Sequence, residues 1–202
     1  MILTIQDKTT HTVAAIDSFG AQLISLKDAD KKEYIWQRDP EIWPRCSPLL
    51  FPAVGNCRDG RTRFDGEWFE MEKHGFCKES DFIVDEQKED AVTFRLTANA
   101  QTRNSYPYDF ILSLTYRLEN GILLMDYCVE NPDCREICYC IGSHPGFICP
   151  LAEGETFEDY QLEFEKEENT CAMPYDLQAL QFDAGKKGLE LKHTQILPLS
   201  YE

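Results

Sequence analysis

Alternation of apolar and polar residues is the feature that most constrains the fold of this 202-residue chain. In residues 112–118 the even positions are apolar and the odd ones polar, and residues 160–165 repeat this pattern. Successive side chains of a strand point to opposite faces, so both segments fit strands with one buried face. No window carries a sustained apolar stripe of helical period. The sequence therefore predicts an all-β fold.

Turn signals indicate how these strands are joined. Asp65-Gly66 and Asn120-Gly121 each separate two strand-like runs, and both pairs suit type I′ hairpin turns. Further strands are expected at residues 2–6, 11–18, 22–27, 82–85, 91–97, 137–141 and 189–191. The acidic residues 153–159 and 165–169 are expected to be solvated loops. Hairpins favour antiparallel pairing, and we expect a large sandwich of two antiparallel sheets.

Length and composition indicate one domain over residues 1–202, because the chain shows no internal repeat, low-complexity tract or linker. The formal net charge of −16 would repel nucleic acid and anionic lipid, so neither is an expected partner. No apolar run approaches the roughly 20 residues that a membrane helix needs, and residues 1–5 lack the start of a signal peptide. We expect a soluble, cytoplasmic protein.

The nine cysteines are an odd number scattered through strand-like and loop-like segments, which favours free thiols in a reducing compartment. Cys134, Cys138 and Cys140 come nearest to a metal-binding pattern. However, alternation would place Cys138 and Cys140 on one face of a strand, and no ligand pair completes the set. We expect small buried hydrophobic residues here and no metal.

Three prolines, Pro44, Pro48 and Pro52, fall within residues 43–56 and forbid a regular ladder there. The segment is expected to be a rigid, shaped loop. Such a loop fits both a connector that plugs the core and a support for a functional site, and the sequence leaves both open.

Two histidines lie in similar surroundings. His144 stands before a proline with Gly142 and Gly146 on either side, and His74 precedes Gly75. The glycines would leave the backbone open to a ligand, and a histidine can give or take a proton near pH 7. Each histidine alone also fits a purely structural role. His11 and His193 are assigned no role.

Several motifs in order along the chain resemble the aldose 1-epimerases (galactose mutarotases), in particular their LacX-like branch. The motifs are Phe51-Pro52-Ala53-Val54-Gly55-Asn56, Asp59-Gly60, Asp65-Gly66, His74-Gly75-Phe76, Tyr106-Pro107-Tyr108-Asp109-Phe110, Ile141-Gly142-Ser143-His144-Pro145-Gly146-Phe147 and Tyr160-Gln161-Leu162-Glu163-Phe164. The resemblance runs from the first strands to about Leu199. It implies a β-supersandwich with a sugar-binding cleft.

The resemblance also implies a reaction, the interconversion of α and β anomers of a free aldohexose such as glucose or galactose, without cofactor or metal. A carboxylate base takes the proton of the anomeric hydroxyl while a histidine acid protonates the ring oxygen. By motif, His144 matches the acid and His74 the histidine that contacts the sugar near its ring oxygen. Arg58 and Asn56, in imperfect register, match sugar-binding positions, and Phe76 can supply an apolar wall.

One element of the family pattern is not matched. The family's base is a late glutamate, which we expect after residue 202 together with further strands, and nothing around Glu202 resembles its motif. An isomerase and a non-catalytic carbohydrate-binding protein therefore both stay open, beside a structural sandwich with incidental histidines. The sequence also leaves open which aromatic residue reaches the sugar; the candidates are Trp36, Trp43, Trp68, Phe76, Tyr106 and Tyr108.

Overall fold

The computed structural model describes residues 1–176, 178, 181–183 and 185–201, so Glu202 lies outside the described residues. The chain forms two compact units, residues 1–147 and residues 148–202. The single domain over residues 1–202 stays a prediction. Among the described residues, none of the helices has the length and apolar character that crossing a bilayer requires.

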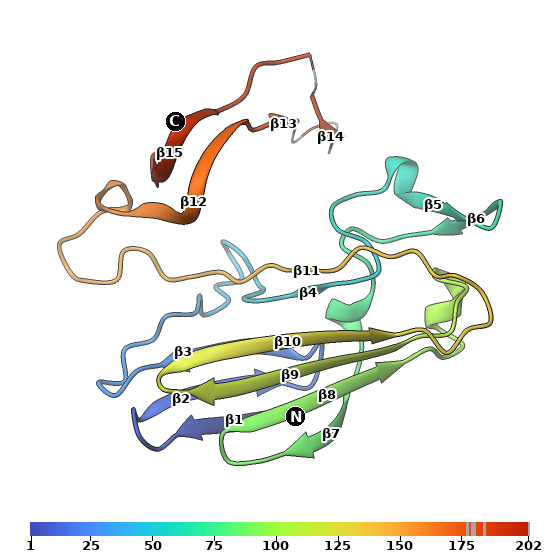
Figure 1. Ribbon diagram of the computed structural model, residues 1–202, viewed down its shortest axis with the longest axis horizontal. Helices are drawn as coiled ribbons and strands as arrows, with labels where there is room; N and C mark the ends of the chain where they lie inside the picture. The colour runs from blue at the N-terminus through green and yellow to red at the C-terminus, as the bar shows by residue number, and fades with distance from the viewer. Residues whose placement is uncertain (177, 179–180, 184, 202) are drawn as a thin grey trace. The chain divides into compact units, whose positions relative to one another are not determined.

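The first unit is built from antiparallel strands (Figure 1). β1, β2 and β3 form one sheet in that order, and β10, β9, β8 and β7 form another. Two short pairs, β4 with β11 and β5 with β6, complete the unit. The elements are β1 (Ile2–Asp7), β2 (Thr12–Asp17), β3 (Gln22–Lys27), β4 (Leu49–Leu50), η1 (Arg58–Gly60), β5 (Arg61–Phe64), β6 (Glu67–Glu70), η2 (Cys77–Glu79), β7 (Ile83–Gln87), β8 (Ala91–Thr97), η3 (Thr102–Asn104), β9 (Ile111–Glu119), β10 (Ile122–Glu130) and β11 (Gly142–Ser143).

The alternation in residues 112–118 produces the expected strand. The even residues of β9 are buried, and its odd residues are half-buried except for the exposed Glu119. At the two predicted hairpins, Asp65 and Gly66 have φ of 48° and 91°, and Asn120 and Gly121 have φ of 52° and 78°. A type I′ turn needs positive φ at both central residues. The all-β prediction and both hairpins are confirmed.

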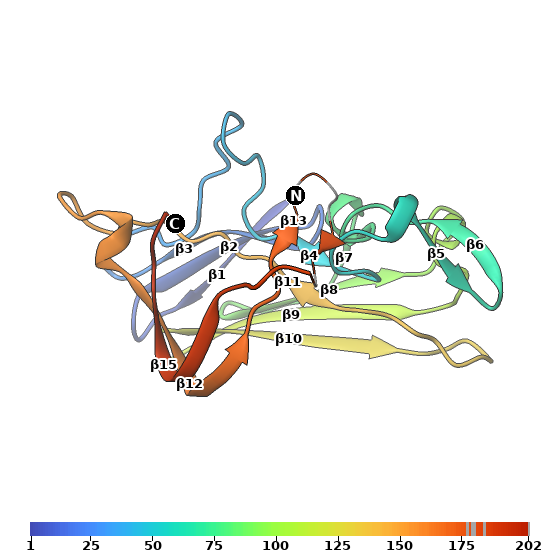
Figure 2. The ribbon, with the colours of Figure 1, turned by 90° about the horizontal axis from the view of Figure 1, so that it is seen from above.

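The core lies between the two large sheets, which are stacked in two layers (Figure 2). Ile5 from β1 and Leu114 from β9 are fully buried in the same cluster. Across this core the Tyr116 hydroxyl donates a hydrogen bond of 2.7 Å to the carbonyl of Ala21. Because both groups are buried, the bond fixes how the sheets meet.

The predicted strand at residues 137–141 is wrong. These residues, all of which the structure describes, form no strand, and pairing is confined to β11 and β4. The reason lies in the partner segment, because Pro48 and Pro52 flank Leu49–Phe51 and have no N–H to extend a ladder. One further bond, from the Cys140 N–H to the Pro52 carbonyl at 2.9 Å, holds the segment in place.

The expectation of buried cysteines in this region is also wrong. Cys134, Cys138 and Cys140 are exposed, whereas Ile137 and Ile141 are the residues that pack against the core. Without a ladder on both sides, the segment turns its bulkier apolar side chains inward and leaves the thiols in solvent.

The second unit contains β12 (Gln161–Cys171), β13 (Tyr175–Asp176), β14 (Gln181–Phe182), β15 (Glu190–Pro198) and the 3-10 helix η4 (Phe157–Asp159). β12 pairs with β15 in an irregular antiparallel ladder, and β13 pairs with β14. Residues 165–169 were expected to be a loop, and they lie within β12 instead. Their side chains are mostly exposed on this two-stranded pair, so the charges stay hydrated and do not oppose strand formation.

Asp7 ties the first sheet to the β9–β10 hairpin. Its carboxylate accepts hydrogen bonds from the Thr9 hydroxyl at 2.6 Å, the Thr10 hydroxyl at 2.9 Å and the Gly121 N–H at 2.9 Å. These bonds, with the Thr9 hydroxyl as the largest cause, hold the pKa of Asp7 well below its usual range. The ionised form of Asp7 therefore joins two turns that are far apart in the sequence.

We predict that Asp7→Asn destabilises the protein at pH 7. The pKa of Asp7 is lowered by folding, so its contribution is present above the unfolded pKa of about 4 and is lost as pH falls through the lower folded value. Urea unfolding at several pH values should show the two proteins converging in strongly acidic solution. Asp30→Asn, at an exposed aspartate, is the control for net charge. A gap that stays constant down to acidic pH would contradict the role of the Asp7 charge.

Candidate functional site

The proline-rich segment carries the short strand β4, and β4 positions His144. β4 pairs with β11, so Ser143 lies opposite Leu49. His144 follows directly, and its N–H donates to the Pro48 carbonyl at 3.2 Å. In Figure 1 the two strands run side by side. The segment that the sequence left undecided therefore supports a candidate site residue.

The same segment positions His74 on its other side. Phe51 forms an isolated parallel bridge with Gly75, and the Phe51 carbonyl accepts the Phe76 N–H at 3.1 Å. Gly75 has φ of 69°, and a Cβ there would lie well inside contact distance of the Phe51 carbonyl and 2.7 Å from the Pro52 nitrogen. Only glycine permits this approach.

The structure brings the two histidines together. The ring centroids of His74 and His144 are 5.9 Å apart. His144 is exposed and His74 is half-buried, so one small ligand can contact both imidazoles. The pairing predicted from two separate motifs thus corresponds to one place in the fold.

His74 is held in a defined protonation state. The backbone N–H of Gly55 donates to the Nδ1 atom of the His74 ring at 3.0 Å, and the backbone N–H of His74 donates to the Gly55 carbonyl at 2.9 Å. A backbone N–H is only a donor, so Nδ1 must be unprotonated and Nε2 must carry the hydrogen. Burial, followed by the charges of Lys73, His144 and Lys78, lowers the pKa of His74. The neutral ring can therefore donate a hydrogen bond through Nε2.

Lys78 supports the turn that carries His74. Its ammonium donates to the Gly75 carbonyl at 2.6 Å and pairs with Glu72 at 3.3 Å. The side chain of Lys78 is only 11% exposed, so its hydrogen bond to the Gly75 carbonyl is largely shielded from water. A shielded charge-assisted bond of this kind stabilises the conformation of Gly75 more than a surface contact would.

The two predicted sugar-binding residues, Asn56 and Arg58, follow Gly55, which is hydrogen-bonded to His74. Asn56 is half-buried beside Gly55, whose N–H binds His74. Arg58 begins η1 with an exposed side chain. The contribution of both residues to a ligand site stays a prediction.

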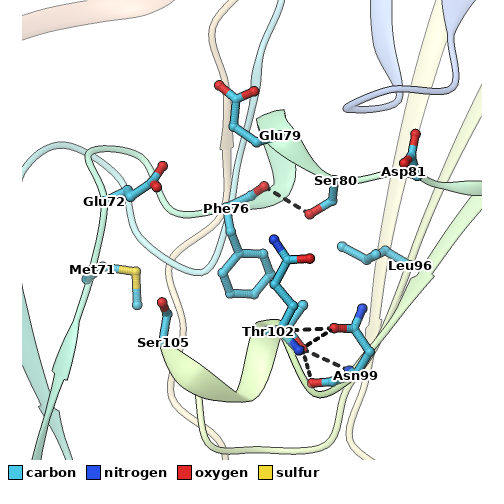
Figure 3. Close-up of a pocket in the computed structure, with 11 residues that line it drawn as sticks. Met71, Glu72, Phe76, Glu79, Ser80, Asp81, Leu96, Asn99, Thr102 and Ser105 are labelled. Carbon is cyan, nitrogen blue, oxygen red and sulfur yellow. Dashed lines mark hydrogen bonds between the residues drawn. The ribbon is translucent and has the colours of Figure 1, made fainter.

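Phe76 lies against the core. Its ring packs on Phe51 and Phe110, with centroid distances of 6.2 Å and 6.0 Å. With Glu72 and Glu79 it also lines a cavity of about 360 Å³ (Figure 3). Glu72 pairs with Lys78, and Glu79 pairs with Arg45. Neither candidate histidine is among the residues that line this cavity. The predicted contact of Phe76 with a ligand stays a prediction.

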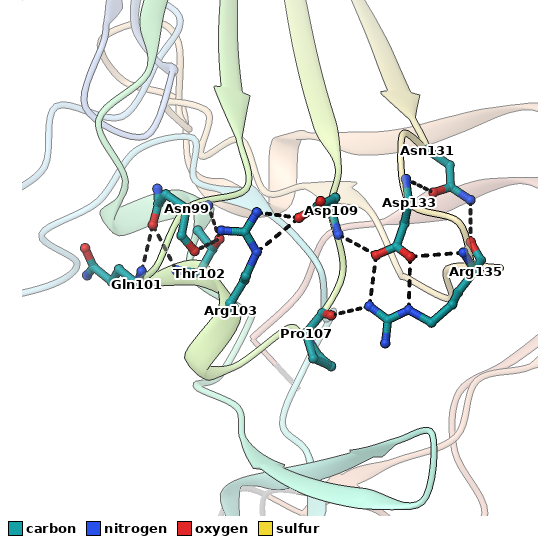
Figure 4. A network of polar contacts seen from close by, with 9 residues as sticks. All are labelled: Asn99, Gln101, Thr102, Arg103, Pro107, Asp109, Asn131, Asp133 and Arg135. Atoms are coloured by element: carbon teal, nitrogen blue, oxygen red, sulfur yellow. Dashed lines mark hydrogen bonds and ion pairs between the residues drawn. The ribbon is translucent and has the colours of Figure 1, made fainter.

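The Tyr106-Pro107-Tyr108-Asp109 motif holds the chain segment that leads to His144. Tyr106 is fully buried, and its hydroxyl donates to the Cys138 carbonyl at 3.1 Å. Asp133 accepts the Asp109 N–H at 2.9 Å and pairs with Arg135, which donates to the Pro107 carbonyl at 2.7 Å (Figure 4). These bonds fix the segment that leads from β10 to β11, and so to His144.

Within the described part of the chain, no group of three or more histidine, cysteine or acidic side chains has an arrangement that could hold a metal ion. The groups that can do chemistry at the site are the two imidazoles, and the His74 ring is held as a neutral hydrogen-bond donor.

Comparison with known proteins agrees with this fold. The family model of aldose 1-epimerase matches residues 1–194, and the chain belongs to that family. The chromosomal protein LacX of Lactococcus lactis subsp. lactis is 37% identical over 178 residues, which are 85% of this chain and 59% of LacX. The chain thus spans less than two thirds of the length of this relative.

Solved structures show the same fold. A galactose mutarotase related enzyme from Lactobacillus acidophilus superposes with a TM-score of 0.91 at 30% identity, over 99% of this chain and 65% of that one. A galactose mutarotase-like protein from Lactobacillus casei gives a TM-score of 0.85 at 31% identity, over 98% and 67% of the two chains. The predicted mutarotase-like fold class is confirmed.

We predict that Gly75→Ala is strongly destabilising, because alanine meets both positive φ and the Phe51 carbonyl. Gly60→Ala is the matched control, since Gly60 has φ of 66° but nothing within 4 Å of the added Cβ. The control should lose only the roughly 1–2 kcal/mol of left-handed backbone strain. Denaturant unfolding measures both. Equal losses would show that the close approach at Gly75 does not matter.

Proposed function

We propose that this protein acts in the interconversion of the α and β anomers of a free aldohexose, with glucose and galactose as the first substrates to test. The pair of imidazoles at 5.9 Å, in a chain of the aldose 1-epimerase family, carries the proposal. It is supported by an arrangement in which one histidine is a fixed donor and the other is exposed.

In the proposed reaction a carboxylate base takes the proton of the anomeric hydroxyl while His144 gives a proton to the ring oxygen. The bond between C1 and the ring oxygen breaks, and an open-chain aldehyde forms. Rotation about C1–C2 and closure on the other face give the second anomer and return both protons. The family resemblance assigns the base to a glutamate of a late motif, and no residue of the site described above is proposed for that role.

His74 is proposed to bind rather than to transfer a proton. Its Nδ1 is occupied by the Gly55 N–H, and its pKa is lowered, so the ring resists becoming a cation. A neutral donor that stays neutral can hold the sugar oxygen in place while His144 supplies the proton. We propose that Asn56 and Arg58, on the adjoining loop, bind the sugar hydroxyls.

The first test measures both turnover and binding by the 202-residue chain. Polarimetry follows the decay of pure α-D-glucose or α-D-galactose, and saturation-transfer NMR detects bound sugar. An accelerated decay supports the isomerase. Binding without acceleration assigns this chain a carbohydrate-binding role without turnover. Absence of binding would contradict the site altogether.

The roles of the two histidines are predicted to separate on mutation. In any form of the protein that turns over sugar, His144→Asn should lower kcat by roughly 10²- to 10⁴-fold, the usual contribution of general acid catalysis, and change affinity little. Equal losses in turnover and affinity would contradict the role of His144 as acid.

For His74 the chain allows a matched pair of variants. In His74→Asn the side-chain oxygen can still accept the Gly55 N–H, but the Nε2 donor is gone. In His74→Gln the amide nitrogen can stand where Nε2 does. We expect roughly 3- to 10-fold weaker sugar binding for Asn and a smaller loss for Gln, measured by NMR titration. Unchanged affinity in both variants would make His74 purely structural.

A further inference from the structure

The structure shows which of the candidate aromatic side chains are accessible beside the histidine pair. Tyr106 and Tyr108 are buried, and Phe76 belongs to the layer packed on the core. Trp68 lies on the β5–β6 hairpin with Arg61 stacked over its ring at 5.0 Å. None of these four offers its ring to the histidine pair as an accessible surface.

Trp43 does. Its ring centroid lies 5.3 Å from that of His144, with an angle of 53° between the planes. Trp43 is half-buried and His144 is exposed, so the indole and the imidazole border the same accessible surface. Among the described residues, neither the hydrophobic core nor the layer packed against it includes Trp43. Burial in the core therefore does not account for this large apolar side chain.

The chain fixes Trp43 firmly in this place. The Trp36 indole N–H donates to the Trp43 carbonyl at 2.8 Å, and the Trp43 N–H donates to the Asp39 carbonyl at 2.8 Å. Two residues after His144, a Cβ at Gly146 would lie 2.7 Å from the Trp43 ring, so a glycine is required for the indole to pack here. The Gly146 N–H in turn donates to the Cys46 carbonyl at 2.6 Å.

A fixed aromatic face beside two hydrogen-bonding groups fits a monosaccharide. A pyranose presents polar hydroxyls along its edge and C–H groups on its faces, and ligand sites combine apolar walls with a few placed polar groups. An indole that is ordered before the ligand arrives loses little entropy on binding. Its contact with C–H groups contributes area burial that hydroxyls cannot supply.

We propose that Trp43 is a sugar-contacting residue whose indole packs on the C–H face of a monosaccharide while His74 and His144 contact its polar edge. This inference rests on the proposed function and adds to it the residue that sets the plane of the sugar ring. It also assigns the apolar wall of the sugar site to Trp43 in the proline-rich segment 43–56, whereas the sequence had indicated Phe76 for that wall.

The experiment labels the protein with 5-fluorotryptophan, which gives one ¹⁹F signal for each of the three tryptophans. Single Trp→Phe variants assign the signals. Titration with D-galactose or D-glucose should shift the Trp43 signal saturably and leave the Trp68 signal in place. A shift confined to Trp68 or Trp36 would overturn the proposal.

Affinity provides the second measurement. Trp43→Ala should weaken sugar binding roughly tenfold, and Trp43→Phe should restore most of the loss, because a phenyl ring still offers an aromatic face. Trp68→Ala is the matched control on an exposed tryptophan and should bind as the native chain does. Circular dichroism checks that each variant is folded.

The outcomes separate this inference from the function on which it rests. If Trp43→Ala and Trp43→Phe both bind sugar normally while His74→Asn binds weakly, the site stands and Trp43 has no part in it. If the native chain binds no sugar, the proposed function fails and the role of Trp43 fails with it. If Trp43→Ala weakens binding and Trp43→Phe does not rescue it, the aromatic contact is refuted.

Discussion

The approach of Gly75 to the carbonyl of Phe51 is the constraint on which the candidate site depends. That carbonyl accepts the Phe76 N–H on one side, while β4 just before it pairs with β11 on the other. A segment of a few residues between two prolines therefore sets the positions of both histidine-bearing segments. Proline limits the ladder to two residues, and this leaves His144 at its end rather than within it.

Electrostatics then give the two histidines different properties, although their motifs look alike. His74 is half-buried, and the Gly55 N–H at Nδ1 would have to be displaced before the ring could become a cation. His144 has its backbone N–H bonded to Pro48 and its ring exposed beside Trp43. One ring is a fixed donor, and the other is accessible to solvent and ligand. An acid and a binding group need this kind of difference.

The sequence predicted the regular part of the fold well and the irregular part poorly. Alternation located β8 and β9, and the Asn120-Gly121 pair located a hairpin, because these signals are local. Residues 137–141 alternate too, yet they form no strand, because a strand also needs a partner and the partner is proline-flanked. Residues 165–169 show the reverse, since charge is compatible with a strand whose two faces are both exposed.

For the site, the sequence supplied the residues and the structure supplied the reasons. The glycines of the two motifs were expected to leave the backbone open to a ligand. Instead, the space that a side chain would fill is occupied by the protein itself, by the Phe51 carbonyl at Gly75 and by the Trp43 ring at Gly146. Both glycines let other parts of the chain reach the histidines. Such contacts join residues about 24 and 100 positions apart, and no local pattern in the sequence contains them.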